Sequence, residues 1–270
     1  MASSSLDARQ RDRYARQLAI DSFDEAAQRA LLSSRALVVG VGGLGSAAVQ
    51  YLAAAGVGTL RIADDGAVKR SNLQRQVVHG AADVGEPKVD SAARFVDALD
   101  PGIEVERRPV RVDADSVESL LDSVDVVVDG LDNFRGRFVV NDAARLAGVP
   151  FVHGAVYAFE GQYAAFRPGG PCYRCLLPEA PDPDAVPSGE PIGVFSTLPG
   201  VIGCLQATEA LKLLAEVGSP LDDRVVRYDA ADATFVDAPL ERDSDCPVCG
   251  PNPIASVDDV DYDDSCRIER

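Results

Sequence analysis

Closely spaced glycines and paired cysteines are the residues of this chain whose types and spacing most clearly indicate chemistry. The glycines lie in VVGVGGLG, where Gly40, Gly42 and Gly45 fit the pattern G-x-G-x-x-G, and Gly43 and Leu44 stand inside it. Glycines allow a tight turn, and a helix that begins there offers unpaired N–H donors to a phosphate. The pattern predicts a nucleotide-binding turn, for either a dinucleotide or ATP.

An acidic residue about 20 residues beyond such a turn is expected to bind a ribose. Asp64 takes this place, directly after the strand-like run Thr59–Ala63. A nicotinamide-dependent oxidoreductase and an ATP-using enzyme would both use this residue, so Asp64 does not separate the two.

A polar stretch follows Asp64 and contains Ser71, the amide of Asn72 and the planar cation of Arg75. Lys88, one of only three lysines in the chain, follows at the start of a predicted helix. Fixed cations near a triphosphate neutralise the charge that builds on leaving pyrophosphate. Each of these residues alone is more simply interpreted as a surface charge or a loop cap, but together they favour an ATP site.

Asp132 and Asn133 follow the predicted strand Val124–Val128. Ligands in doubly wound sheets bind beyond the carboxyl ends of the strands, and a carboxylate is a hard oxygen ligand. The pair therefore predicts a site for Mg²⁺ on the phosphates.

Four of the six cysteines form two C-x-x-C pairs, Cys172 with Cys175 and Cys246 with Cys249. In a cytosolic chain such pairs favour zinc over disulfides, and unliganded reduced thiols are the alternative.

Short apolar runs alternate with helical patterns from residue 35 to residue 152, which predicts an α/β fold with a Rossmann-like, doubly wound, mostly parallel sheet. A helical arm is expected over residues 1–34, and an antiparallel extension with a crossover loop at residues 176–192 is expected within 153–250. Residues 251–270 are expected to be a solvated acidic tail. The predicted strands are 36–39, 59–63, 103–110, 124–128, 151–157, 161–166, 224–228 and 233–236, and the main predicted helices are 45–55, 87–99, 116–121, 135–147 and 203–217.

The chain has 270 residues and a net charge of −17, which argues against nucleic-acid binding. It shows no unbroken apolar run of 18 residues and no secretory signal, so we expect a cytoplasmic protein without a membrane span. Abundant Asp and scarce Lys are what we expect of a protein that works at high salt.

The order of these motifs resembles the MoeB/ThiF/HesA family, the prokaryotic relatives of ubiquitin-activating enzymes. The resemblance covers Arg13 to Gly250 and is strongest to archaeal activators of ubiquitin-like and sulfur-carrier proteins, and the composition resembles that of haloarchaeal members. The motifs that carry it are VVGVGGLG, Asp64, SNLQRQ, VGEPK ending at Lys88, LDN at 131–133, CYRC at 172–175 and CPVC at 246–249.

The resemblance implies that the C-terminal Gly-Gly tail of a small carrier protein attacks the α-phosphate of MgATP, giving an acyl-adenylate and pyrophosphate. By motif, Gly43 would contact phosphate, and Asp132 would serve the metal and the adenylation step. An arginine from the arm of a second subunit, matched here by Arg16, would complete the site in a homodimer. The two C-x-x-C pairs would form one closed, structural zinc site. His79 and His153 are interpreted as structural.

The chain departs from the family at the cysteine that many members carry on the crossover loop, because Gly189 occupies that position beside Ser188. A glycine provides no nucleophile and a serine is far weaker than a thiolate, so we predict adenylation without a thioester step. No rhodanese-like extension follows Cys249, so an external sulfur donor is expected. Gly66, where relatives often have a second acid, is a smaller departure.

Two other functions compete with this prediction. A non-catalytic scaffold that binds ubiquitin-like proteins is suggested by Gly189. An NAD-dependent oxidoreductase would use the glycine turn but would not need SNLQRQ, Lys88 or four thiolates. Molybdopterin synthesis, thiamine synthesis, tRNA thiolation and protein modification share the adenylation chemistry, and the sequence does not choose among them.

Overall fold

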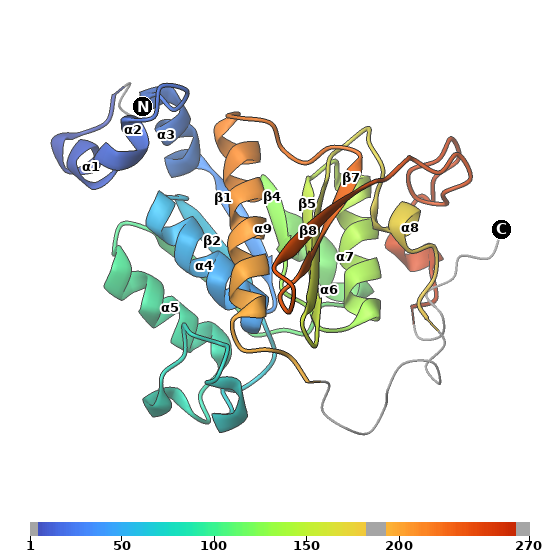
Figure 1. Ribbon diagram of the computed structural model, residues 1–270, viewed down its shortest axis with the longest axis horizontal. Coiled ribbons are helices and arrows are strands. Elements are labelled where there is room, and N and C mark those ends of the chain that lie inside the picture. Colours follow the sequence, from blue (N-terminus) through green and yellow to red (C-terminus); the bar gives the residue numbers. More distant parts are fainter. Residues whose placement is uncertain (1–4, 182–192, 263–270) are drawn as a thin grey trace.

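The computed structural model describes residues 5–181 and 193–262 and contains one sheet of eight strands in the order β3-β2-β1-β4-β5-β6-β7-β8 (Figure 1). The first five strands in this order are parallel, and the last three add in antiparallel fashion. The strands are β1 (Arg35–Val39), β2 (Thr59–Ala63), β3 (Glu104–Arg108), β4 (Val126–Asp129), β5 (Phe151–Tyr157), β6 (Glu160–Phe166), β7 (Arg224–Asp229) and β8 (Thr234–Pro239).

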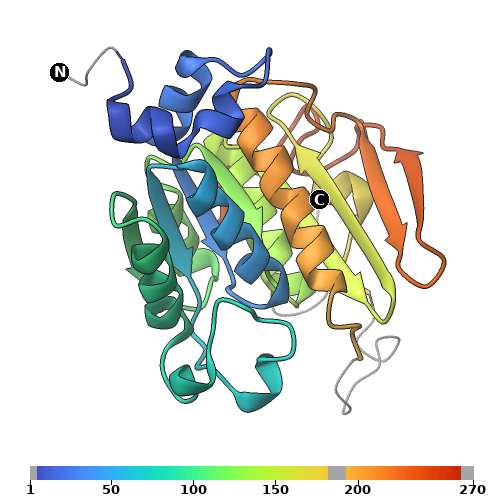
Figure 2. The ribbon, with the colours of Figure 1, turned by 60° about the vertical axis from the view of Figure 1, so that its left-hand side comes forward.

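Helices cover both faces of this sheet, and the sheet separates two apolar cores. α4 and α9 lie side by side in front of the sheet in Figure 2, with α5 beside α4, and α6 and α7 pack on the opposite face. The main helices are α3 (Glu25–Ser33), α4 (Gly43–Ala55), α5 (Lys88–Leu99), α6 (Ala114–Leu121), α7 (Phe134–Ala147) and α9 (Leu198–Ala215). The predicted α/β class, with a parallel half and an antiparallel extension, is confirmed.

The central strands explain why the sheet is parallel and buried on both sides. Val126–Val128 in β4 and Ala36–Val39 in β1 are almost fully buried, and alternate residues belong to opposite cores: Leu37 to one and Val38 to the other. Runs of β-branched residues without polar alternation are typical of such strands. The strand order reverses between β1 and β4, which is where doubly wound sheets bind ligands.

The predicted N-terminal arm is a group of three helices, α1 (Ala8–Arg13), α2 (Ala15–Leu18) and α3, which packs on the domain. Tyr14 and Gln28 are almost fully buried, and Gln28 donates from Nε2 to the carbonyl of Ala55 at the end of α4, 3.0 Å away. The group therefore covers the end of the sheet opposite the glycine turn.

Two expectations are corrected by the structure. The helix expected at 203–217 begins at Leu198, because Pro199 fits the first turn of a helix, where its missing N–H costs no hydrogen bond. The acidic tail is not simply solvated: Asp258, Asp259 and Asp261 are exposed, but Val257, Val260 and Tyr262 are buried against the α7 side of the domain.

By length and composition alone, α9 is the one helix in the described ranges that could span a membrane. Half of it is buried within the domain, and it carries an ion pair between Lys212 and Glu209 at 2.6 Å. Its apolar character matches its place as a core helix that packs beside α4 on one face of the sheet.

Candidate active site and metal centre

The glycine turn lies where β1 and β4 end side by side. Gly40 has φ +86°, which favours glycine, and a Cβ there would lie 2.7 Å from the carbonyl oxygen of Gly130. A side chain on Gly45 would overlap the Gly40 carbonyl, since α4 starts immediately against the turn. These two contacts account for two glycines of the motif.

The first turn of α4 leaves backbone N–H groups available beside the ends of β1 and β4, because the first N–H groups of a helix have no intrahelical acceptor. Gly42 is the N-cap and offers no side chain to satisfy these donors. Gly42 and Gly43 are half-buried, whereas the side chain of Leu44 is buried in the core, so Leu44 contributes its backbone alone. The turn is arranged as an anion-binding site.

Asp64 lies at the end of β2 and joins the turn to the following loop. Its Oδ2 accepts from the N–H of Val41 at 2.7 Å, and its Oδ1 accepts from the N–H of Gly66 at 2.8 Å. The Lys88 Nζ lies 3.5 Å from Asp64 Oδ2, and both side chains are mostly buried. The carboxylate is thus fixed between the glycine turn and the following loop, with a cation beside it.

The polar stretch 71–76 lies against the glycine turn. A Cβ on Gly43 would be 3.5 Å from Cδ of Arg75, so the half-buried Arg75 side chain passes beside the first turn of α4. Arg75 donates weakly to the carbonyl of Ser71 at 3.3 Å. Asn72 also caps its own loop, since its Oδ1 accepts from the N–H of Lys69 at 3.0 Å.

Asp132 and Asn133 follow β4 and are both exposed. Asn133 caps α7, because its Oδ1 accepts from the N–H of Gly136 at 2.8 Å. The Asp132 carboxylate keeps its oxygens open to solvent apart from a 3.5 Å contact with the amide of Asn133. Asp132 is therefore the better candidate for a metal or reacting group, and Asn133 is chiefly a structural cap.

Arg16 is not near these residues in the same chain. It lies exposed on α2, next to Gln17, whose amide reaches the carbonyl of Ala55 at the far end of α4. Since α4 has 13 residues and rises about 1.5 Å per residue, Arg16 and the glycine turn are separated by about 20 Å. The structure thus brings together the predicted site residues of the turn, Asp64, Arg75 and Lys88, and leaves Arg16 apart.

Sequence reasoning missed the buried polar groups that support these loops. Gln76, 4% exposed, lies beside Gly42, and its Oε1 has no hydrogen-bond partner among the described residues. Arg137 donates to Asp129 Oδ2 at 3.1 Å and to the carbonyl of Leu131 at 2.6 Å, which holds the start of the Asp132 loop. Gln76 ends the polar stretch 71–76 and Arg137 lies in the predicted helix 135–147, and neither pattern marks the residue as buried.

The four paired cysteines converge, which confirms the prediction that they form one cluster. Their Sγ atoms lie within 4.8 Å of one another, with 3.6 Å between Cys172 and Cys246 and 3.3 Å between Cys175 and Cys249. Thiolates bound to zinc at about 2.3 Å in a tetrahedron stand about 3.8 Å apart. Backbone N–H groups of Asp243 and Cys249 donate to two of the sulfurs, as expected around thiolate ligands.

A buried ion pair fastens this cluster to α7. Arg174, between the first two cysteines, contacts Asp142 with Nε–Oδ1 at 2.9 Å and a second nitrogen at 2.7 Å from Oδ2. Both side chains have no exposed area, and Tyr262 donates to the same carboxylate at 2.9 Å. The guanidinium also stacks on Phe138, 4.6 Å from the ring centre.

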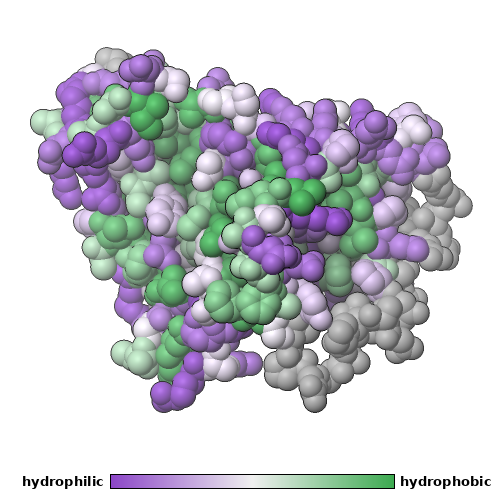
Figure 3. Space-filling view, in the orientation of Figure 1, coloured by the Kyte–Doolittle hydropathy of each residue, from purple (hydrophilic) through white to green (hydrophobic). Residues whose placement is uncertain are grey.

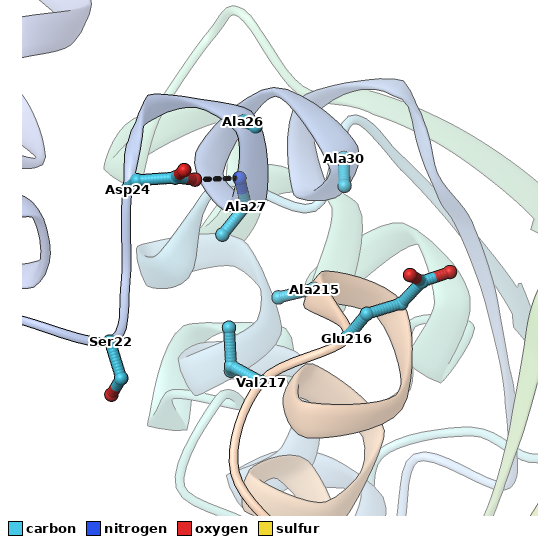
Figure 4. Close-up of a pocket in the computed structure, with 8 residues that line it drawn as sticks. All are labelled: Ser22, Asp24, Ala26, Ala27, Ala30, Ala215, Glu216 and Val217. Carbon is cyan, nitrogen blue, oxygen red and sulfur yellow. Dashed lines mark hydrogen bonds between the residues drawn. The ribbon is translucent and has the colours of Figure 1, made fainter.

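A surface hollow between α3 and the end of α9 lies remote from these groups (Figure 4). Ala27, Ala30, Ala215 and Val217 line it, and its Asp24 carboxylate already caps α3 by accepting from the N–H of Ala27. The hollow lies apart from the glycine turn and the cysteines, so the candidate site stays at the carboxyl ends of the strands.

The fold and this site define an α/β protein with a glycine turn of the nucleotide-binding kind and a four-cysteine cluster that could hold a metal ion. More particularly, the chain belongs to the ThiF family, whose family model matches residues 14–248. The resemblance to the MoeB/ThiF/HesA family is thereby confirmed.

Similar proteins are known in archaea and bacteria. The SAMP-activating enzyme E1 of Haloferax volcanii is 53% identical over 264 residues, which are 98% of each chain. The sulfur carrier protein adenylyltransferase of Thermus thermophilus is 45% identical, over 95% of this chain and 97% of its own. The molybdopterin-synthase adenylyltransferase of Salmonella typhimurium is 44% identical, over 88% of this chain and 96% of its own.

Solved structures support the fold independently. Escherichia coli MccB with ATP superposes with a TM-score of 0.77 at 21% identity, over 88% of this chain and 73% of MccB. At this identity the likeness establishes the shared fold alone.

Proposed function

We propose that this protein is an adenylyltransferase of the ubiquitin-activating type, which uses ATP to adenylate the C-terminal glycine of a small ubiquitin-like or sulfur-carrier protein. One observation carries the proposal: in a ThiF-family chain, the glycine turn, Asp64, Arg75 and Lys88 meet at the reversal point of the sheet. The names of the similar enzymes support the same reaction.

In this reaction the carrier carboxylate forms a bond to the α-phosphorus, and the bond from that phosphorus to the pyrophosphate oxygen breaks. A glycine carboxylate is already ionised at neutral pH, so no general base is required. Catalysis then depends on in-line positioning and on charges that face the leaving pyrophosphate.

Each group of the site has a role that matches its geometry. Asp64 accepts from the ribose hydroxyls, and the N–H groups of the α4 turn bind phosphate oxygens. Arg75 beside the turn and Lys88 beside Asp64 neutralise phosphate charge, with Ser71 and Asn72 shaping the segment that leads to Arg75. The open carboxylate of Asp132 would hold Mg²⁺, which when bound would neutralise further phosphate charge.

A homodimer would bring Arg16 to the site. Arg16 lies a helix length away from its own turn, so any contact with ATP must come from the arm of a second copy. The outward side of α4 and α9 supports such pairing, because Tyr51 and Ala54 are exposed and Val201 and Leu205 are half-buried there. Figure 3 shows apolar surface gathered at the centre of this face.

The four-cysteine cluster fits Zn²⁺, since four thiolates in a closed tetrahedron are typical of structural zinc. Zinc would hold the segment after β6 to the segment after β8. A cytoplasmic location and an external sulfur donor complete the proposal, and both are open to direct test.

Carrier-dependent exchange of pyrophosphate into ATP tests the reaction. We expect exchange at high salt when the correct Gly-Gly-tailed protein is added, and loss of exchange in Lys88→Ala. Lys212→Ala is the matched control, because this lysine pairs with Glu209 on α9, far from the turn. Full exchange in Lys88→Ala would contradict the assignment.

A non-catalytic scaffold is the second candidate, because Gly189 replaces the family's loop cysteine. That segment lies outside the described residues. A scaffold would bind the carrier without exchanging pyrophosphate. The remaining alternative is an oxidoreductase, which NAD would stabilise and ATP would not. Measuring the melting temperature with each nucleotide therefore distinguishes it from an ATP-using enzyme.

A further inference from the structure

His79 lies directly beneath the nucleotide turn, on a loop that is distant from the turn in sequence. Its side chain is buried, with 5% of the residue exposed, and its Nε2 is 3.1 Å from the carbonyl oxygen of Val41. Its Nδ1 is 2.8 Å from Oγ of Ser91 on α5, and this hydroxyl is 2.9 Å from Asp83 Oδ2. A chain of polar contacts therefore runs from an acidic loop to the glycine turn.

The contact with Val41 fixes the direction of one peptide group. In a trans peptide the C=O of one residue and the N–H of the next point in opposite directions. A hydrogen bond that holds the Val41 carbonyl inward, toward His79, therefore directs the Gly42 N–H outward, to the half-buried side of the turn. Asp64 holds the preceding peptide through the Val41 N–H, so Val41 is fixed on both sides.

Counting protons shows that Nε2 must carry one. The Val41 carbonyl only accepts, so the 3.1 Å contact requires an Nε2–H donor. The single hydroxyl proton of Ser91 goes either to Nδ1, which makes the ring the neutral Nε2–H tautomer, or to Asp83, which requires Nδ1 to donate as well. Both arrangements leave Nε2 protonated.

We propose that His79 is a positioning residue for nucleotide binding: its Nε2–H holds the Val41 carbonyl and so directs the Gly42 N–H at a phosphate oxygen of ATP. The proposal rests on the proposed function, since it assumes that the turn binds ATP. His79 touches neither substrate nor metal in this account, and it acts through the backbone of Val41 and Gly42.

Two amide substitutions separate this role from simple packing. The amide of Gln can take the place of Nε2 and donate to Val41, whereas the shorter Asn can replace only Nδ1 and reach Ser91. We expect His79→Asn to weaken ATP binding about tenfold, as for the loss of one oriented donor to a charged group, and His79→Gln to bind within about threefold of wild type. Val117→Ala would open a cavity in the core on the α6 and α7 side of the sheet, so this variant controls for general destabilisation.

The measurement is the dissociation constant of MgATP by calorimetry, at one pH and salt concentration, beside the melting temperature of each variant. Equal weakening in His79→Asn and His79→Gln, or weakening that follows melting temperature across all three variants, would overturn the proposal. Absence of ATP binding to the wild-type protein would instead overturn the proposed function.

A second measurement uses the wild-type protein, so it does not depend on whether a variant folds. The chain has only two histidines, so ¹⁵N spectra of histidine-labelled protein contain two rings. We expect the Nε2 of His79 to be protonated and its signal to shift when MgATP is added. An unprotonated Nε2 would overturn the proposal.

Discussion

The buried pair between Arg174 and Asp142 gives the sharpest prediction about stability. Asp142→Ala would remove the carboxylate that lies 2.7 Å from the guanidinium of Arg174, a side chain with no exposed area, and that accepts from Tyr262. Breaking a buried ion pair by removing one partner costs about 3–5 kcal/mol. At about 2–4 °C per kcal/mol for a domain of this size, the melting temperature should fall by about 6–20 °C.

A surface pair with the same separation provides the matched control. Arg167 and Asp222 also approach to 2.7 Å, but both are about half exposed. Exposed pairs contribute about 0–1 kcal/mol, so Asp222→Ala should change stability little. Urea unfolding followed by circular dichroism compares the two variants at the same salt concentration. A cost for Asp142→Ala within 1 kcal/mol of the control would refute the argument from burial, at about the error of such measurements.

Further predictions concern the metal, the pH dependence and the turn. Cys175→Ser should lower bound zinc well below one ion per chain, as measured by elemental analysis, while unchanged zinc would contradict a four-thiolate site. Burial opposes ionisation of Asp129, but Arg137 and His153 outweigh it and lower the pKa of this carboxyl. Its contribution to stability is therefore present above the usual pKa and lost on acidification, so the unfolding free energy should decrease below about pH 4. Gly45→Ala should abolish ATP binding in a calorimetric titration, since its side chain would overlap the turn.

The parts of the fold that depend on short stretches of neighbouring residues could be predicted from the sequence. Apolar runs such as Val126–Val128 indicate buried parallel strands, and the glycine spacing places the turn against the start of α4. The convergence of the four cysteines was predicted too, because paired C-x-x-C spacing is specific. In each case the signal lies within a few residues.

The supporting contacts could not be predicted, because they join residues far apart in the chain. Tyr262 meets Asp142 across 120 positions, which turned part of an expected solvated tail into packed structure. His79 was interpreted as structural, and only the structure shows that the backbone it holds belongs to the glycine turn. Arg16 was assigned by resemblance alone, and its role stays a prediction until a dimer is examined.

The most direct test of the central claim is the mass of the carrier protein after incubation with enzyme, Mg²⁺ and ATP. The account predicts a fraction of the carrier with one AMP on its C-terminal carboxylate, dependent on ATP and absent with Lys88→Ala. A carrier that binds the enzyme but gains no AMP under any of these conditions would contradict the account.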